Sequence, residues 1–356
     1  MKSIKSLKIK DLKGKKVLVR IDFNVPIVEG KITDNFRIKK GIPTIQYLVD
    51  KGAQVVILMH LGKDGTDDIT PVAKEFFKIS KISKKDVEFY PNLRSFAGET
   101  ENDKSFAKAV ASMGDMYVND AFSVSHRAHA SVVGIPKILP SYAGLQLEEE
   151  IKHLSLVLKE VQHPFLFILG GAKFSTKMPL IKKYLKLADY IFVGGALAND
   201  FLETKGLPVG KSLVDDSISV PVDILNNTKI LLPTDVLVKN KIMFSARKVS
   251  EVEGDDVIID IGAESVKSLE DYISKAKLVL WNGPLGKYED NGAGATKKIL
   301  KFIANSKALS IIGGGDTVAL ISEMKMEKKF TFVSTGGGAT LDFLAKGTLP
   351  GIKALK

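Results

Sequence analysis

Short apolar runs alternate with amphipathic stretches along the whole chain. The runs of a first series are rich in β-branched residues and predict buried strands at 17–21, 54–59, 87–90 and 116–119. Between them, apolar positions recur with helical spacing at 36–50, 71–77 and 103–112. This alternation predicts a parallel sheet that is covered by helices on both faces.

A second series of strands follows a long helical pattern at 147–161, whose first turn is acidic, as suits a helix N-terminus. The strands predicted in this series are 165–169, 190–193, 230–232, 257–261, 278–281, 309–312 and 330–334. Two series joined by one helix predict two α/β domains, each a Rossmann-like three-layer arrangement, with a hinge in the interdomain helix. We place the two domains at 1–147 and 164–340, the helix at 148–163, and a C-terminal segment at 341–356.

The residues that follow the strands differ between the two series. Ligands of open parallel sheets bind beyond the carboxyl ends of the strands. In the first series these positions carry polar and charged side chains, namely Asp22, Asn24, His60, Arg94 and Arg127. In the second series they carry glycine turns that lead into helices, at 170–171, 194–195, 313–315 and 336–338. Such turns direct backbone N–H groups at phosphate. We therefore expect a site for a small anion in the first half and a polyphosphate site in the second.

The distribution of charge supports an anionic ligand. Lysine and arginine number 52 and aspartate and glutamate 41, a net charge of +11, yet only five of the cations are arginines and four of those precede residue 130. Arginine binds phosphate and carboxylate with two parallel hydrogen bonds, so this bias favours an oxyanion pocket in the first third. No arginine runs interleave with aromatic residues, and we expect no nucleic-acid partner.

Composition excludes several other classes of protein. Cysteine is absent, which removes disulfides, thiol nucleophiles and cysteine-bound metals. No apolar run approaches the ~18 residues of a membrane helix, and lysines throughout the first twenty residues leave no secretory signal. We expect a cytoplasmic protein without a membrane partner.

The common nucleotide motifs are missing. The stretch 206–212 is one residue short of a Walker A loop and follows a helix, and no G-x-G-x-x-G follows a strand. Asp316, directly after three glycines, fits a helix cap and a Mg²⁺ ligand equally well. His126 and His129 lack a nearby third ligand, which disfavours zinc.

The chain closely resembles phosphoglycerate kinases, in the family's order and over nearly its whole length. The stretches that carry the resemblance are VLVRIDFNVP (17–26), ITDNFRI (32–38), HLGK (60–63), GDMYVNDAFSVSHRAHAS (114–131), ILGGAKFSTK (168–177), LWNGPLG (280–286), GGGDTV (313–318), STGGGATL (334–341) and LPGIKAL (349–355). The resemblance implies a glycolytic and gluconeogenic kinase that transfers phosphate between 1,3-bisphosphoglycerate and ADP, giving 3-phosphoglycerate and ATP, with Mg²⁺ on the nucleotide.

The resemblance also implies which residues bind each substrate. The acidic substrate would meet residues of the first domain: Asp22, Phe23, Asn24, Arg37, His60, Leu61, Gly62, Lys63, Arg94 and Arg127. The nucleotide would meet residues of the second domain: Gly171, Lys173, Lys177, Gly195, Asn282, Pro284, Glu289, Gly314, Gly315, Asp316 and Thr317. Arg37, Lys177 and the backbone amides at Gly314 and Gly337 would act on the transferring phosphate, and Asp316 would bind Mg²⁺. The segment 341–356 would return to the first domain of a monomer whose domains close for in-line transfer.

Some positions depart from the family's pattern. Lys63 replaces an arginine, Pro91 and Thr176 replace acids, and Lys287 replaces an apolar residue beside the nucleotide. The region 64–93 is short by about one strand–helix unit, which predicts a smaller first sheet. The alternative to an active kinase is therefore a catalytically weakened nucleotide- or phosphate-binding protein of the same fold.

Overall fold

Strands that are buried along their whole length set the architecture, because both faces of such strands must be covered by helices. In the computed structural model, which describes residues 1–172, 174–215, 219–290 and 292–355, the chain divides into two units. One unit comprises Met1–Lys152 and Gly338–Lys356, and the other comprises His153–Gly337. Among the described residues, no helix is long and apolar enough to cross a bilayer.

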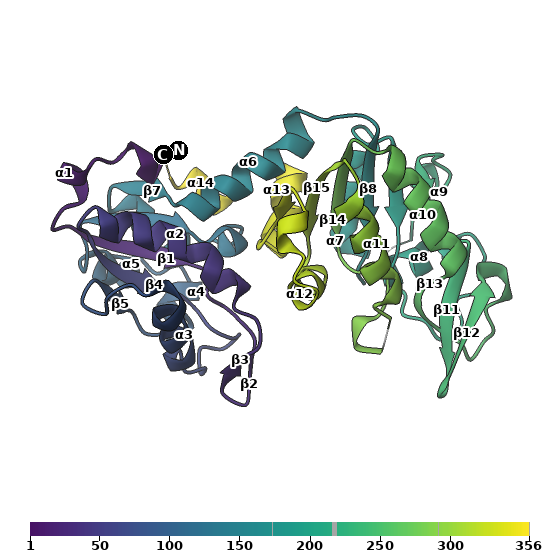
Figure 1. Cartoon of the computed structure of the whole chain (residues 1–356), viewed down its shortest axis with the longest axis horizontal. Helices are drawn as coiled ribbons and strands as arrows, with labels where there is room; N and C mark the ends of the chain where they lie inside the picture. Colours follow the sequence, from purple (N-terminus) through teal and green to yellow (C-terminus); the bar gives the residue numbers. More distant parts are fainter. Residues whose placement is uncertain (173, 216–218, 291, 356) are drawn as a thin grey trace. The chain divides into compact units, whose positions relative to one another are not determined.

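The first unit is built on a five-stranded parallel sheet (Figure 1). Its strands, in spatial order, are β5 (Val87–Phe89), β4 (Gln54–Leu58), β1 (Lys16–Ile21), β6 (Met116–Asp120) and β7 (Ser141–Ala143). A two-stranded ribbon, β2 (Ile27–Val28) with β3 (Lys31–Ile32), follows β1. All residues of β1 except Lys16 are buried, as expected for a strand inside a doubly covered sheet.

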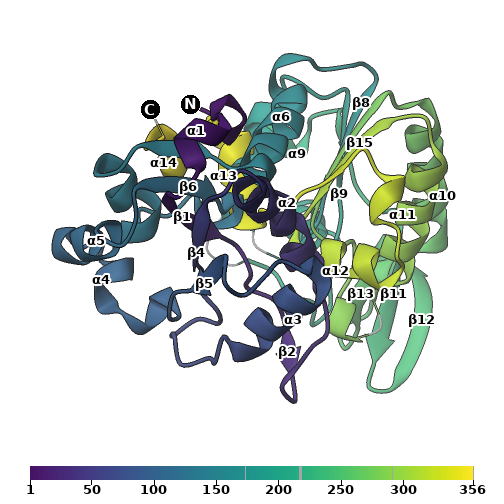
Figure 2. The same cartoon turned by 60° about the vertical axis from the view of Figure 1, so that its left-hand side comes forward.

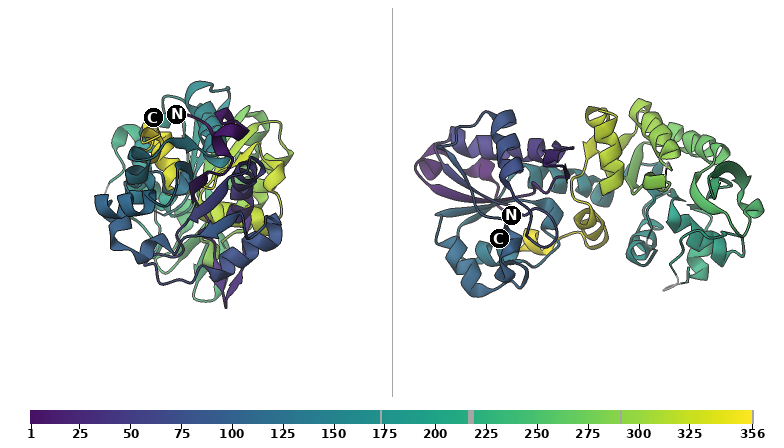
Figure 3. Two further views of the ribbon diagram at one scale, coloured as in Figure 1. Left: turned by 90° about the vertical axis from the view of Figure 1, so that its left-hand side faces the viewer. Right: turned by 90° about the horizontal axis from the view of Figure 1, so that it is seen from below.

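Seven helices belong to the described part of the first unit. They are α1 (Ile9–Leu12), α2 (Phe36–Asp50), α3 (Thr70–Ser80), α4 (Ala97–Thr100), α5 (Lys104–Ala111), α13 (Gly338–Lys346) and α14 (Pro350–Lys353). The C-terminal segment packs on this unit, because Gly351 donates a hydrogen bond to the carbonyl of Ser125 (2.8 Å) and the ring of Phe343 meets Phe122 edge-on. The yellow α14 accordingly lies near the N-terminus in Figure 3.

Helix α6 (Leu145–Lys159) contributes residues to both units, with the division after Lys152. Asp120, at the end of β6, caps it by accepting hydrogen bonds from the backbone N–H groups of Gln146 (2.8 Å) and Leu147 (3.1 Å). An acidic side chain is favoured at a helix N-terminus, so Glu148 of the first turn shares this role with a residue distant in the sequence.

The second unit contains a six-stranded parallel sheet. Its spatial order is β10 (Ile230–Leu231), β9 (Tyr190–Val193), β8 (Phe165–Leu169), β14 (Leu278–Asn282), β15 (Leu309–Gly313) and β16 (Phe332–Val333). Its helices are α7 (Phe174–Tyr184), α8 (Ala196–Thr204), α9 (Val222–Leu225), α10 (Ala263–Lys275), α11 (Gly294–Asn305) and α12 (Gly315–Glu323). Helices α10 and α11 pack side by side (Figure 2).

One predicted strand of the second series was assigned to the wrong sheet. Strand β13 (Val257–Ile261) does not join the parallel sheet but pairs antiparallel with β11 (Asp235–Asn240), which also pairs with β12 (Met243–Lys248). This hairpin was not predicted from the sequence. Its outer strand β12 is mostly exposed, so it lacks the buried apolar run by which the other strands were recognised.

Both parallel sheets reverse their strand order beside their first strand. In the first unit β1 lies between β4 and β6, and in the second β8 lies between β9 and β14. The crevice beyond the carboxyl ends of the strands at such a reversal is the preferred ligand site of open α/β sheets. We therefore expect ligand sites at the residues that follow β1 and β6 in the first unit, and at those that follow β8 and β14 in the second.

Candidate functional site

Asp22 is the centre of a polar cluster at the end of β1. Its carboxylate accepts hydrogen bonds from Arg37 Nη1 (2.8 Å), from the backbone N–H of Asn24 (3.0 Å) and from Ser123 Oγ. Burial opposes the ionisation of Asp22, but Arg37 and these hydrogen bonds outweigh it and lower the pKa of the carboxyl. A charged Asp22 holds Arg37 in place.

Arg37 lies in the first turn of α2 and is partly accessible to solvent, with 30% of its side chain exposed. Its Nη1 contacts Asp22 and the carbonyl of Asn24 (3.2 Å). A guanidinium group carries five donors in a rigid fork, so these two contacts leave other N–H groups for an anion. Arg37 is thus a cation that is held in place by Asp22 and Asn24 and still has N–H groups that can bind an anion.

A chain of hydrogen bonds joins the loops that follow β1, β4 and β5. The side-chain oxygen of Asn24 accepts from the backbone N–H of Gly62 (3.0 Å). Arg94 Nη1 donates to the carbonyls of Gly62 and Lys63, the latter at 3.1 Å. The side chain of Lys63 is itself exposed. The predicted residues Asn24, Gly62 and Arg94 therefore meet at one edge of the sheet.

His60 is buried and contacts Arg20, which was not predicted as a site residue. Arg20 Nη2 lies 3.1 Å from Nδ1 of His60, and because arginine has no acceptor, Nδ1 must accept and the imidazole proton lies on Nε2. Burial and the charge of Arg20 lower the pKa of His60 well below its usual value. His60 can therefore serve an anion as a neutral donor.

Arg20 is held by a further buried network. Its Nε donates to Ser131 Oγ (2.9 Å), and Ser131 in turn donates to Glu99 through its backbone N–H (2.8 Å) and its hydroxyl (2.6 Å). Arg20 and Glu99 are each 1% exposed. The signal in the sequence that could have revealed Arg20 is an arginine within an apolar strand, since such a residue is rarely buried without partners.

Cationic side chains lie within electrostatic reach of one another in this unit. Burial and the charges of Arg127 and Arg20 lower the pKa of Arg94. Arg127 also donates from Nε to His126 (3.4 Å). Repulsion among cations that are partly removed from water favours a bound anion. The side chains of Phe23 and Leu61, by contrast, lie in the hydrophobic core, so only their backbone can face a ligand.

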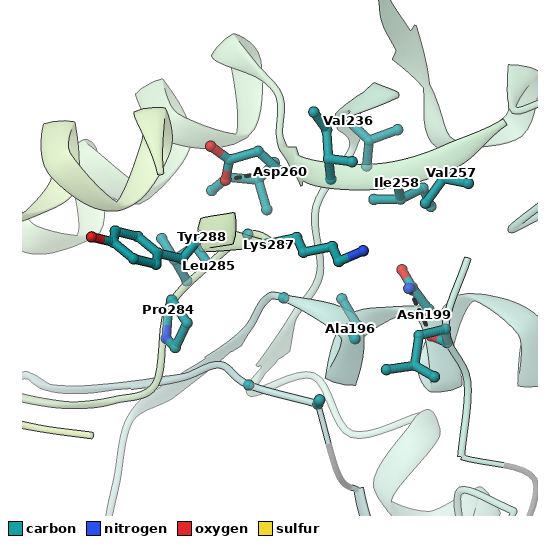
Figure 4. Close-up of a pocket in the computed structure, with 18 of the residues that line it drawn as sticks. Ala196, Asn199, Val236, Val257, Ile258, Asp260, Pro284, Leu285, Lys287 and Tyr288 are labelled. Carbon is teal, nitrogen blue, oxygen red and sulfur yellow. Dashed lines mark hydrogen bonds between the residues drawn. The ribbon is translucent and has the colours of Figure 1, made fainter. Parts of the chain in front are cut away.

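The second unit contains a pocket of about 610 Å³ (Figure 4). Of the residues predicted to bind the nucleotide, the pocket is lined by Gly171, Gly195, Pro284, Glu289 and Asp316. Its size falls within the range typical of small-molecule sites. Lys173 lies outside the described residues.

Closely packed glycine turns form the edge of this pocket. Gly170 donates from its N–H to the carbonyl of Asn282 (2.9 Å), and Gly171 to that of Pro284 (3.1 Å). Gly314 has a φ of +97°, and a Cβ there would lie 2.7 Å from the nitrogen of Gly283. Only glycine allows this close approach.

Two helices follow the turns that contain Gly314 and Gly337. Helix α12 begins at Gly315 with Gly314 as its N-cap, and α13 begins at Gly338, directly after Gly337 (φ +51°). Both helices thus start one residue later than Gly314 and Gly337 themselves. The first N–H groups of a helix have no partner within it and are available to an anion.

Lys177 of α7 and Asn282 at the end of β14 form a buried polar pair, and Thr317 is buried in the first turn of α12, which follows β15. Lys177 Nζ donates to Asn282 Oδ1 (2.8 Å), and burial lowers its pKa to about 8. Asn282 Nδ2 and Thr317 Oγ1 are buried and have no hydrogen-bond partner among the described residues. Leaving such groups unsatisfied is costly, so the cation and the two free groups suit a ligand rich in oxygen atoms, such as phosphate.

The residues around Asp316 fit a divalent cation. Partial burial and the nearby carboxylate of Glu289 raise the pKa of Asp316, and a cation between them would relieve that repulsion. Among the described residues, no group of three or more histidine, cysteine or acidic side chains could hold a metal. Mg²⁺ bound here would take most of its ligands from nucleotide phosphates and water, as is usual for this ion.

Known proteins are similar to this chain over nearly its whole length. Residues 7–347 match the family model described as phosphoglycerate kinase. Phosphoglycerate kinase of Dictyoglomus turgidum is 41% identical and that of Coprothermobacter proteolyticus 39% identical, each alignment covering at least 98% of both chains. The D. turgidum alignment spans 391 positions, 391 − 356 = 35 more than this chain has residues, so the relative contains residues that this chain lacks.

Solved structures agree with these matches. The structure of phosphoglycerate kinase from Coxiella burnetii is 32% identical with a TM-score of 0.82, covering 99% of this chain and 98% of the other. That from Pyrococcus horikoshii is 28% identical with a TM-score of 0.88, covering 100% and 98%. Sequence, fold and the two polar sites thus lead to one conclusion: the chain belongs to the phosphoglycerate kinase family.

Proposed function

We propose that this chain catalyses the reversible transfer of a phosphoryl group between 1,3-bisphosphoglycerate and ADP, giving 3-phosphoglycerate and ATP. The single observation that carries the proposal is the pair of complementary sites. One is cationic and organised around Asp22 and Arg37, and the other is organised around Lys177 and Asn282 beside a nucleotide-sized pocket. Membership of the family supports both assignments.

The first unit would bind the acidic substrate. Asp22 and Asn24 would meet its hydroxyl and carboxyl groups, and Arg94 and Arg127 would hold the phosphate that is not transferred. Neutral His60 would add a hydrogen bond from Nε2 to the same phosphate, because Arg20 occupies its Nδ1. The rest of the anion's charge is then balanced by guanidinium groups, which stay protonated at neutral pH.

The second unit would bind the nucleotide. The backbone N–H groups at the start of α12 and at Gly337, the last residue of this unit, would surround the transferring phosphate together with the ammonium group of Lys177, and Thr317 would bond to a neighbouring phosphate oxygen. Mg²⁺ at Asp316 would neutralise charge on the nucleotide phosphates. The glycines allow the backbone to approach those phosphates closely.

The reaction needs no covalent intermediate on the protein. A carboxylate oxygen of 3-phosphoglycerate forms a bond to the terminal phosphorus of ATP, while the bond from that phosphorus to the β-phosphate oxygen breaks and ADP leaves. Phosphoryl transfer asks for alignment and charge neutralisation, which Arg37, Lys177 and helix N-termini can supply. We further propose that closure of the two domains excludes water, which would otherwise hydrolyse the acyl phosphate.

A coupled assay of ATP formation from 1,3-bisphosphoglycerate and ADP tests the proposal. We expect turnover with added Mg²⁺, and a loss of at least about 10²-fold in kcat for Lys177→Met. Turnover in the wild type would also dispose of the alternative, a weakened binding protein. ADP binding without any turnover would support that alternative and contradict our proposal. We propose further that the enzyme acts as a cytoplasmic monomer, for which sedimentation and fractionation are the tests.

A further inference from the structure

The nucleotide-sized pocket of the second unit has an apolar end that the predicted phosphate ligands do not occupy. Val236 of β11 and Val257 of β13 form one wall, and Ala196 and Asn199 of α8 lie opposite (Figure 4). Apolar walls of this kind suit the flat faces of an aromatic base. Polar side chains interrupt this apolar lining, namely those of Asn199, Lys211, Asp260 and Lys287, of which Lys211 pairs with Asp255 (2.6 Å) and Asp260 accepts hydrogen bonds from the backbone N–H groups of Ile261 and Ala295.

Asn199 offers a buried acceptor without a partner. The residue is 2% exposed, and its Nδ2 donates to the carbonyl of Leu213 (2.9 Å). Because only the amide nitrogen can donate to a carbonyl, this bond fixes the orientation of the amide and leaves Oδ1 toward the pocket. Asn199 Oδ1 has no hydrogen-bond partner among the described residues. Such an atom calls for an N–H donor from a ligand.

Lys287 offers a cation at the same end of the pocket. Its backbone N–H donates to the carbonyl of Ile259 (2.6 Å), which fixes the base of the side chain, and its Nζ contacts Asp290 Oδ2 (2.6 Å). The bond to Asp290 raises the pKa of Lys287, so the amine stays protonated. An ammonium group has three donors, and Asp290 engages one. Figure 4 shows the side chain extending into the pocket toward Asn199.

We propose that Asn199 and Lys287 recognise the N1 and position-6 edge of a purine base, an inference that rests on the nucleotide site proposed above. Asn199 Oδ1 would accept from the 6-amino group of adenine, and Lys287 Nζ would donate to the adjacent N1. In a 6-oxopurine the donor is N1–H and the acceptor is the 6-oxygen, so the base would shift by one position in the pocket to place N1–H at Asn199 Oδ1 and the 6-oxygen at Lys287 Nζ. A purine without a 6-substituent has no N–H group on this edge, so it cannot donate a hydrogen bond to Asn199 Oδ1.

Three diphosphates distinguish this proposal from purely apolar recognition of the base. Initial rates are measured with 1,3-bisphosphoglycerate and ADP, IDP or the 5′-diphosphate of unsubstituted purine riboside. We expect similar KM values for ADP and IDP and a KM about tenfold or more higher for the unsubstituted purine, the usual effect of one unpaired buried group. Little change in kcat is expected, because the reacting phosphates are the same.

Two variants and a control refine the test. Asn199→Leu should bring the KM ratio between the unsubstituted purine and ADP close to one, whereas Lys287→Met should raise both KM values and leave the ratio unchanged. Lys297→Met is the matched control, because Lys297 pairs with Glu323 (2.8 Å) outside the pocket. Lys297→Met should change neither the KM for ADP nor the KM for the unsubstituted purine diphosphate.

Equal KM values for ADP and the unsubstituted purine in the wild type would overturn the inference, whether or not Asn199→Leu folds. Calorimetric binding of the same three diphosphates gives the same comparison without turnover. Failure of the proposed kinase function would appear differently, as absence of turnover with every nucleotide.

Discussion

Arg20 Nη2 lies 3.1 Å from Nδ1 of His60 in the interior of the first unit. This contact, together with burial, keeps the imidazole neutral with its proton on Nε2. We predict that His60 shows the Nε2–H tautomer throughout pH 5.5–8 in long-range ¹H–¹⁵N NMR spectra, with its signals assigned by their loss in His60→Gln. Titration near pH 6.5, or a proton on Nδ1, would contradict this assignment.

The lowered pKa of His60 also makes the stability of the folded protein depend on pH. Unfolded His60 takes up a proton near its ordinary pKa of 6.5, while the folded residue does not. Protonation therefore favours the unfolded chain, and the contribution of His60 to stability is present above pH 6.5 and lost as the pH falls below it.

Arg37 is predicted to be the first-unit cation that faces the transferring phosphate. Arg37→Ala should lower kcat by at least about 10²-fold, the usual loss for one donor to the transition state. Steady-state kinetics in the ATP-forming direction measure the effect. Lys39→Ala is the matched control, because Lys39 is an exposed cation of the same helix. Near-normal turnover in Arg37→Ala would refute the role.

Lys177 should give the enzyme an alkaline limit. Because burial lowers its pKa to about 8, the ammonium group loses its proton as the pH rises through that value, and the phosphate loses its cation. We predict that kcat/KM for ADP falls about tenfold per pH unit well above pH 8 in the free enzyme. Lys177→Arg should lack this limb, even at lower activity, since guanidinium stays charged. An identical limb in both proteins would assign it to another group.

Gly314 should not tolerate a side chain. Its φ of +97° and the 2.7 Å approach of a Cβ to the nitrogen of Gly283 predict that Gly314→Ala loses on the order of 1–3 kcal/mol of stability and binds nucleotide more weakly. Gly315→Ala is the control for stability, because a Cβ there meets nothing within 4 Å. Urea unfolding of the two variants gives the comparison, and equal losses would show that the strain lies elsewhere.

The buried strands could be predicted from the sequence because apolar, β-branched runs mark them directly. The predicted run at 165–169 coincides with β8 (Phe165–Leu169), and the predicted helix at 36–50 coincides with α2 (Phe36–Asp50). A buried apolar run marks a strand but does not show which sheet that strand joins. The run at 257–261 has the same character, yet it pairs with the hairpin strand β11, and a local pattern carries no information on its partner.

Some of the site residues could likewise be predicted from the sequence, and others could not. Asp22, directly after β1, was predicted because topology places strand ends together, and Asn282, the last residue of β14, was predicted from the family resemblance. Arg20 and Asn199 were missed because they lie within a strand and a helix, where their importance depends on contacts with residues distant in the sequence. Ser123, which bonds to Asp22 from 101 residues away, was missed for the same reason.

The central claim is that phosphate passes directly between two small molecules held by the two sites. The stereochemical course at phosphorus tests it most directly, using ATP made chiral at its γ-phosphate with oxygen isotopes and sulfur, and 3-phosphoglycerate as acceptor. A single in-line displacement predicts inversion of configuration in the acyl phosphate product. Retention would require two successive displacements through a phosphorylated residue and would contradict the account.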